Sequence, residues 1–161
     1  MSYDRVLAQA TIFQGLSGAD LELINSIATI RDGNTGDVVF EEGSASDELY
    51  VISNGEVDIV VDPALVGEQE SGGSILITTL RRGQSFGEMA LVSQNPRAAT
   101  ARLAQHDTSL LVISREALSR LCDEYPRLGY ALMQNLAADL ARKMRATDQL
   151  IQERVTWTAV R

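Results

Sequence analysis

The segment "FGEMALVSQNPRAATA", from Phe86 to Ala101, is the stretch that most constrains the fold and function of this chain. It holds one acid, Glu88, and one base, Arg97, in an otherwise uncharged, alanine-rich sequence. The residues after Gly87 predict one to two turns of helix, whose N-terminus would present backbone N–H groups and a partial positive charge. Arg97 would add a planar, permanently charged group suited to phosphate. The segment therefore predicts an anion-binding site.

A carboxylate beside a phosphate is repulsive unless it binds another group. Glu88 could accept a hydrogen bond from a sugar hydroxyl, because an ionised carboxylate is only an acceptor. Together with Arg97 it would then recognise a ribose phosphate, and a contact to the 2′-hydroxyl would distinguish ribonucleotides from deoxyribonucleotides. Ala98 and Ala99 are small enough to bring their backbone N–H groups to the same anion. The alternative is a structural ion pair between Glu88 and Arg97.

The N-terminal segment, residues 1–30, predicts helices. Ser17 is a candidate N-cap, and Asp20 follows three residues later as in a capping box. From residue 31 to residue 113 glycines separate short β-rich runs, which predicts a β-barrel or sandwich. Asn54-Gly55 predicts a β-hairpin, and the polar stretch 63–73 predicts an exposed hairpin loop. The expected strands lie at 37–42, 48–53, 56–62, 74–80, 100–105 and 108–114.

The chain is expected to be helical again from residue 114 to residue 153. Ser114 is a candidate N-cap, and Pro126 would end one helix and begin a longer one. Every fourth residue of the longer helix is apolar, namely Leu128, Leu132, Leu136, Leu140 and Met144. This stripe predicts packing within the domain and also offers a surface for a homodimer. Residues 154–161, including Trp157, are expected to form a tail or a partner contact.

Composition limits the functional classes. The 161 residues carry a formal net charge of −8, which argues against a broad nucleic-acid surface. A single cysteine, Cys122, makes an internal disulfide impossible, and a buried structural thiol is expected there. No apolar run is long enough for a membrane span or signal peptide, which predicts a cytoplasmic protein. The one histidine, His106, is expected in a surface turn, so neither a metal site nor an enzyme is predicted.

The stretches "GQSFGEMALVSQNPRAATA" and "GDVVFEEGSASDELYVISNGEVDIV" carry a family resemblance. The first closely resembles the phosphate-binding cassette of cyclic nucleotide-binding domains, which occur in regulatory subunits of cyclic-AMP-dependent kinase, catabolite activator proteins and cyclic-nucleotide-gated channels. The second resembles the glycine-marked strands of the same family. The likeness covers about residues 10–150. It implies a mainly β fold with flanking helices: an antiparallel double-stranded β-helix (jelly roll) with N-terminal helices, a short cassette helix and two C-terminal helices.

The resemblance also implies roles for residues of the cassette, here taken as 84–101. Arg97 would contact the exocyclic oxygens of the cyclic phosphate, and Glu88 the ribose 2′-hydroxyl. Gly87 and Ala98 would offer backbone N–H groups, and Ala99 would line the pocket. The full set of predicted ligand-site residues is Phe86, which would anchor the cassette in the core, with Gly87, Glu88, Met89, Ala90, Arg97, Ala98 and Ala99.

The resemblance implies a non-enzymatic sensor whose regulatory ligand is a cyclic nucleotide. Relatives that prefer cyclic GMP carry Thr or Ser directly after the arginine, so Ala98 favours cyclic AMP over cyclic GMP. The ligand would move the C-terminal helices and so signal to an unidentified effector protein. The base is capped by the last helix in this family, and the candidates are Arg142, Arg145 and Gln149. The alternative is the sensor part of a transcription regulator without its helix-turn-helix domain.

Overall fold

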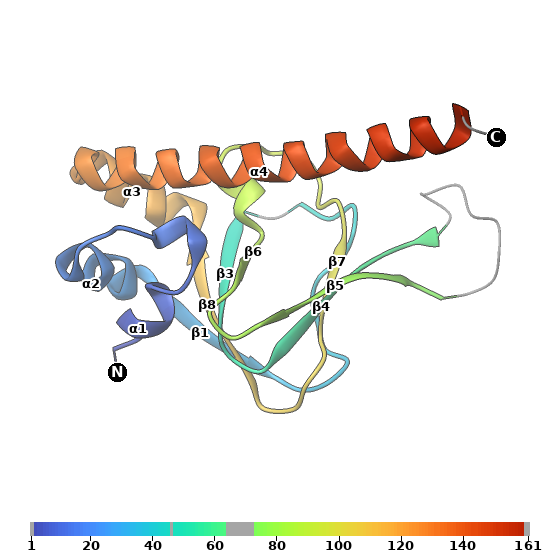
Figure 1. The fold of residues 1–161 in the computed structure, drawn as a ribbon. Helices are drawn as coiled ribbons and strands as arrows, with labels where there is room; N and C mark the ends of the chain where they lie inside the picture. Colours follow the sequence, from blue (N-terminus) through green and yellow to red (C-terminus); the bar gives the residue numbers. More distant parts are fainter. Residues whose placement is uncertain (1, 46, 64–72, 160–161) are drawn as a thin grey trace.

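A computed structural model describes residues 2–45, 47–63 and 73–159 (Figure 1). The N-terminal segment forms α1 (Asp4–Leu7), the 3-10 helix η1 (Thr11–Phe13) and α2 (Gly18–Ile27). The hydroxyl of Ser17 accepts a hydrogen bond from the backbone N–H of Asp20, and the Asp20 carboxylate accepts one from the N–H of Ser17. Both are 3.1 Å long, so the predicted capping box is confirmed.

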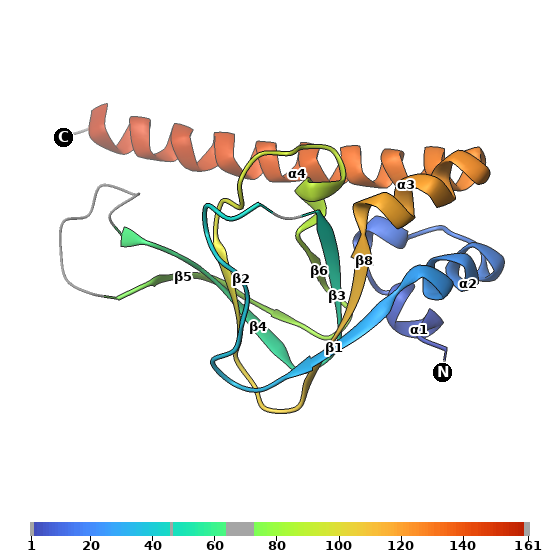
Figure 2. The ribbon, with the colours of Figure 1, turned by 180° about the vertical axis from the view of Figure 1, so that it is seen from behind.

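Eight strands form two four-stranded sheets, ordered β1-β8-β3-β6 and β2-β7-β4-β5 (Figure 2). Every pair of neighbouring strands is antiparallel, which confirms the predicted jelly roll with flanking helices. Neither β1 nor β6 was among the expected strands, and β1 begins within the segment that was predicted to be helical. The strands are β1 (Thr29–Gly33), β2 (Val38–Phe40), β3 (Glu48–Asn54), β4 (Glu56–Val61), β5 (Ile75–Arg81), β6 (Ser85–Phe86), β7 (Thr100–Leu103) and β8 (Thr108–Ser114).

The hairpin predicted at Asn54-Gly55 is wrong. The strands that it joins, β3 and β4, lie in different sheets. Gly55 adopts a φ of +90° where the chain passes against the first residue of β8, and a Cβ there would lie 2.2 Å from the Thr108 hydroxyl. The turn therefore carries the chain from one sheet to the other. The hairpin predicted around the polar stretch 63–73 has the expected strands, since β4 pairs with β5. Most of its loop lies outside the described residues.

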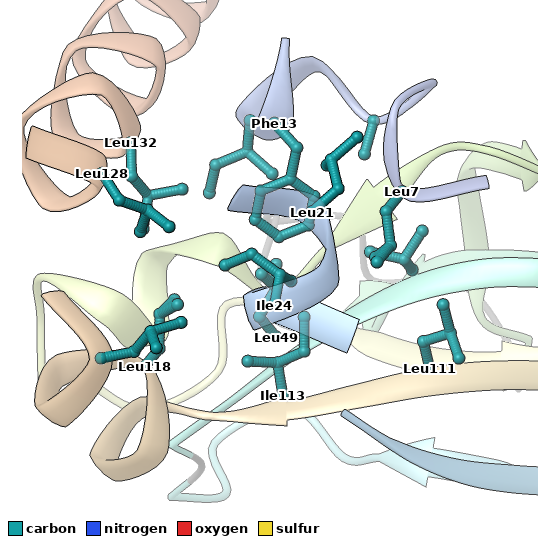
Figure 3. Packing of buried hydrophobic residues seen from close by; sticks show 14 of the residues in the cluster. Leu7, Phe13, Leu21, Ile24, Leu49, Leu111, Ile113, Leu118, Leu128 and Leu132 are labelled. Atoms are coloured by element: carbon teal, nitrogen blue, oxygen red, sulfur yellow. The ribbon is translucent and has the colours of Figure 1, made fainter. Parts of the chain in front are cut away.

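The central strands contribute side chains to two hydrophobic clusters. Alternate residues of β3 point to opposite faces, as the pleat requires. Tyr50 and Ile52 lie in the cluster between the two sheets, whereas Leu49 and Val51 lie in the cluster between the first sheet and the helices. Figure 3 shows that side chains from the N-terminal helices, β3, β8 and the C-terminal helices meet in the second of these clusters. This shared core fixes the helices against the sheet.

The C-terminal helices begin where the sequence predicts. Helix α3 (Arg115–Glu124) is capped by the Ser114 hydroxyl, which accepts a hydrogen bond of 3.1 Å from the N–H of Ala117. Helix α4 (Pro126–Ala159) starts at Pro126 but continues past the predicted end near residue 153. Residues 154–159 are therefore helical rather than a tail.

Helix α4 is fixed at its first half and leaves the core in its second. Leu128, Leu132 and Leu136 are buried, whereas Met144 is 67% exposed, so the predicted apolar stripe packs only in part. The Asn135 amide donates hydrogen bonds to two backbone carbonyls of the N-terminal segment, at 3.0 and 2.8 Å. Figures 1 and 2 show α4 crossing above the β domain and extending beyond it. Among the described residues, no helix has the length and hydrophobicity that crossing a membrane would demand.

Candidate functional site

The candidate site begins with a glycine turn directly after β6. Gly87 has a φ of +79° and precedes the single 3-10 turn η3 (Glu88–Leu91). A Cβ on Gly87 would lie 2.9 Å from Nη1 of Arg97 and 3.0 Å from the Glu48 carbonyl oxygen. Glycine is therefore required both for the backbone conformation and for the space that the arginine occupies. The predicted cassette helix is present as a single turn of four residues, and it is 3-10 rather than α-helical.

Arg97 is buried at only 8% exposure, and both its backbone and its side chain are held. Its N–H donates to the Ser44 carbonyl at 2.9 Å, and its carbonyl accepts from the N–H of Gly43 at 2.7 Å. Its Nη2 donates to the Glu48 carbonyl at 2.7 Å, and Nη1 donates to the Gly87 carbonyl at 3.2 Å. The guanidinium is thus oriented between the start of β3 and the start of the cassette.

Three aromatic rings support the arginine. The guanidinium carbon Cζ of Arg97 lies 4.1 Å from the centre of the Phe40 ring, a cation–π geometry. Phe40 in turn contacts Tyr50 and Phe86, with ring centres 5.8 and 6.0 Å away. Burial lowers the pKa of Arg97, while electrostatic interactions with Tyr50 and with the nearby carboxylates oppose that shift. Aromatic residues in strands usually indicate a hydrophobic core, so this support of Arg97 could not be predicted from the sequence.

Tyr50 links the aromatic cluster to an acid. Its hydroxyl donates a 2.6 Å hydrogen bond to the carboxylate of Glu48. Burial, then this hydrogen bond and the charge of Glu48, raise the pKa of Tyr50 to about 12. The phenol is therefore neutral and acts as a donor at physiological pH.

The carboxylate of Glu88 is paired with a lysine of α4. Glu88 is 8% exposed, and its Oε1 lies 2.5 Å from Nζ of Lys143. Lys143 also bonds Asp139 at 2.9 Å, and Arg142 bonds the other oxygen of Asp139 at 3.1 Å. Burial lowers the pKa of Lys143, but its hydrogen bonds to Glu88 and Asp139 outweigh this, so the net shift is upward.

This pairing adds a residue that the sequence analysis did not propose. Helix α4 passes over the cassette and brings Lys143 to a buried acid. Among the ion pairs of the described residues, the partner of Glu88 is Lys143 and not Arg97. Arg97 is nevertheless close enough for the Glu88 charge to act on its pKa. The two predicted ligand contacts therefore lie in one site, together with a lysine that the sequence did not identify.

The other predicted positions fall on the same cassette. Phe86 and Ala90 are buried, Ala99 is half-buried, and Met89 and Ala98 are exposed. The proposed base-capping residues, Arg142, Arg145 and Gln149, are exposed on α4.

The structure also places two side chains that the sequence analysis considered separately. His106 is exposed in a turn. Cys122 is half-buried, and burial raises the pKa of its thiol, which reduces its reactivity. The described part of the chain contains no group of three or more His, Cys, Asp or Glu residues that could hold a metal ion.

Comparison with known proteins gives consistent matches. Residues 31–125 match the family described as "Cyclic nucleotide-binding domain". The chain is 32% identical over 137 residues to the cyclic AMP receptor protein of Thermus thermophilus, covering 85% of this chain and 58% of that protein. It is 32% identical over 123 residues to the cAMP-dependent protein kinase regulatory subunit of Mycosarcoma maydis, covering 74% of this chain and 22% of that protein.

The solved structures agree with the sequence matches. The catabolite activator protein of Thermus thermophilus superposes with a TM-score of 0.75 at 29% identity, covering 88% of this chain and 62% of that chain. In both curated relatives described above, this chain spans less than two thirds of the relative's length.

Proposed function

This chain belongs to the cyclic nucleotide-binding domain family, and we propose that it binds a 3′,5′-cyclic nucleotide, with cyclic AMP preferred over cyclic GMP. We further propose that binding is relayed to an effector protein through the C-terminal helices. The observation that carries the proposal is the buried guanidinium of Arg97. It is oriented by hydrogen bonds to two backbone carbonyls and lies beside the glycine turn at Gly87.

Each part of the ligand has a proposed partner. Arg97 would neutralise the exocyclic phosphate oxygens, and a buried guanidinium is suited to this because its planar fork bonds phosphate in pairs. Glu88 would accept a hydrogen bond from the ribose 2′-hydroxyl. The backbone N–H groups of Gly87 and Ala98 would complete the phosphate contacts, and Ala99 would line the pocket.

The preference for cyclic AMP rests on Ala98, which lacks a hydroxyl that could bond a guanine. It is supported by two relatives, which are named as a cyclic AMP receptor protein and a cAMP-dependent kinase regulatory subunit. The expected order of affinities is cyclic AMP, then cyclic GMP, with 5′-AMP weakest. Introducing Ala98→Thr should narrow the difference between the two cyclic nucleotides.

Calorimetric titration tests the phosphate contact. Arg97→Ala should lose about 2–4 kcal/mol of cyclic AMP binding, because a buried charge contact loses one partner. Arg97→Lys keeps the charge but not the fork, and should recover only part of that loss. Arg102→Ala is the matched control, since Arg102 is an exposed arginine of β7. If the native chain ignores every 3′,5′-cyclic purine nucleotide at millimolar concentration, the proposed function is wrong.

The proposed relay rests on the contact between the cassette and α4. Ligand bound at Glu88 would act on α4 through Lys143, since that lysine joins the two elements. Amide hydrogen exchange should therefore report altered protection in α4 around Lys143 when cyclic AMP is added. Unchanged exchange at saturating ligand would argue against a relay through this helix.

The alternative function, the sensor part of a transcription regulator, stays open because the curated relatives are longer than this chain.

In either case the second half of α4 is the proposed homodimer surface. Met144, Ile151 and Val155 are exposed at spacings of seven and four, so they share one helix face. Sedimentation should show a dimer that Ile151→Gln weakens. A monomer at all concentrations would contradict this assignment.

A further inference from the structure

We propose that Lys143 is a positioning residue of the cyclic nucleotide site. It pairs with the Glu88 carboxylate and holds it in a fixed orientation toward the ligand, and it makes ligand binding and the docking of α4 favour each other. This inference rests on the proposed function, because it assigns regulation to the same site.

The first step is the cost of burying Glu88. A buried carboxylate is unfavourable unless it is paired and hydrogen-bonded. The side chain of Glu88 is only 10% exposed, and Lys143 donates to its Oε1 at 2.5 Å. The second oxygen, Oε2, retains the capacity to accept a ligand hydroxyl, since an ionised carboxylate has about four lone-pair sites. Lys143 and a ribose can therefore share Glu88 without competing.

The second step is the fixed place of the ammonium group. Lys143 is also bonded to Asp139, one turn earlier on α4, at 2.9 Å. Arg142 holds the opposite oxygen of the same aspartate at 3.1 Å. The lysine stem lies at the surface, with its side chain 58% exposed, but its charged end is held between two largely buried acids. Such an arrangement orients Glu88 rather than merely neutralising it.

The third step is the location of Lys143 along the helix. The preceding part of α4 is anchored by Leu132 and Leu136 in the core, and residues 144–153, which follow, are exposed. Figures 1 and 2 both show α4 passing directly above the short turn that follows β6. Lys143 is thus the charged contact at the point where α4 leaves the domain.

The consequence is thermodynamic coupling between the ligand and α4. When α4 moves away, Glu88 loses its bond to Lys143 and with it its fixed orientation, so placing the carboxylate against the ribose costs more free energy. By reciprocity, a ligand that needs an oriented Glu88 stabilises the docked position of α4. A ligand without a 2′-hydroxyl does not use Glu88, so its affinity should be nearly independent of Lys143.

The test compares Lys143→Met with Arg120→Met by titration with 3′,5′-cyclic AMP and its 2′-deoxy analogue. Each variant removes one helical cation that bonds an acid four residues earlier, but Arg120 pairs with Glu116 on α3, whereas Lys143 also contacts Glu88. Lys143→Met should weaken cyclic AMP about tenfold, on the scale of removing one partner of a partly exposed charge pair, and weaken the deoxy analogue much less. Arg120→Met should change both affinities less than about twofold. Lys143→Arg should restore most of the discrimination.

The outcomes separate this inference from the proposed function. If the native chain binds neither nucleotide, both proposals fall. If it binds but the two methionine variants behave alike, the role of Lys143 is wrong while the proposed function stands. Tighter binding by Lys143→Met would also overturn the inference, because it would show that the lysine competes with the ribose. Thermal unfolding of both variants, at exposed positions, checks that they remain folded.

Discussion

The guanidinium of Arg97 rests on the ring of Phe40, with Cζ 4.1 Å from the ring centre, although the two residues belong to different segments of the fold. The ring supplies an apolar surface of negative potential beneath a charge that burial disfavours. The position of the proposed phosphate-binding group therefore depends on a residue of β2, far from the cassette in sequence.

Replacing Phe40 with leucine should weaken cyclic AMP binding about three- to tenfold, because the cation–π contact is lost while most apolar volume stays. Titration calorimetry measures the effect. Phe86→Leu is the comparison, since Phe86 belongs to the same aromatic cluster but does not carry the guanidinium. Equal losses in the two variants would mean that the cluster acts only through packing.

Gly87→Ala should destabilise the chain and also weaken ligand binding. Alanine would have to adopt the left-handed backbone conformation of Gly87, which side chains disfavour. Its Cβ would also approach Arg97 and the Glu48 carbonyl too closely. The strain alone costs about 1–3 kcal/mol. Gly36→Ala is the matched control, because Gly36 has a φ of +92° with no neighbouring atom within 4 Å of the new Cβ. Denaturant unfolding should show a smaller loss for Gly36→Ala, and cyclic AMP binding should be retained only there.

Tyr50 should make stability depend on alkaline pH. Its folded pKa of about 12 is raised above the ordinary value of 10.0, so folding favours the protonated phenol. This contribution is complete below pH 10.0 and is lost as the pH rises toward about 12. Tyrosinate absorbance should show that one of the four tyrosines titrates late, and Tyr50→Phe should abolish that phase. Titration of all four near pH 10.0 in the folded chain would contradict the assignment.

Leu132→Ala should destabilise the chain by about 2–5 kcal/mol, because Leu132 is fully buried where α4 meets the N-terminal helices. Leu150→Ala, on the exposed part of the same helix, should change the unfolding free energy by less than about 0.5 kcal/mol. Chemical denaturation measures both. Similar losses at the two positions would mean that the second half of α4 is packed in solution.

Local sequence signals predicted much of this structure. The capping box at Ser17, the cap at Ser114 and the start of α4 at Pro126 depend on a few neighbouring residues, and all three are confirmed. The turn at Gly55 was also predicted correctly, but the prediction that the strands on either side of it pair with each other was wrong. A turn signal states that the chain reverses locally and carries no information about which sheet receives the next strand.

The candidate site likewise has residues that could be predicted from the sequence and residues that could not. Glu88 and Arg97 could be proposed from one short segment, because the spacing of an acid, a glycine and a base is visible there. Lys143 lies 55 residues from Glu88, and only the path of α4 over the cassette brings them together. Phe40 was missed for a related reason: its ring meets Arg97 through the packing of two distant strands.

In the proposed relay, the second half of α4 would turn a small event at the cassette into a large displacement. From Lys143 to Ala159 the helix continues for 16 residues, which span about 24 Å at the usual helical rise. If this rod pivots at the lysine by about ten degrees, its far end sweeps roughly 4 Å. Amplification of this kind would let a partner at the tip sense a small change in the position of one carboxylate.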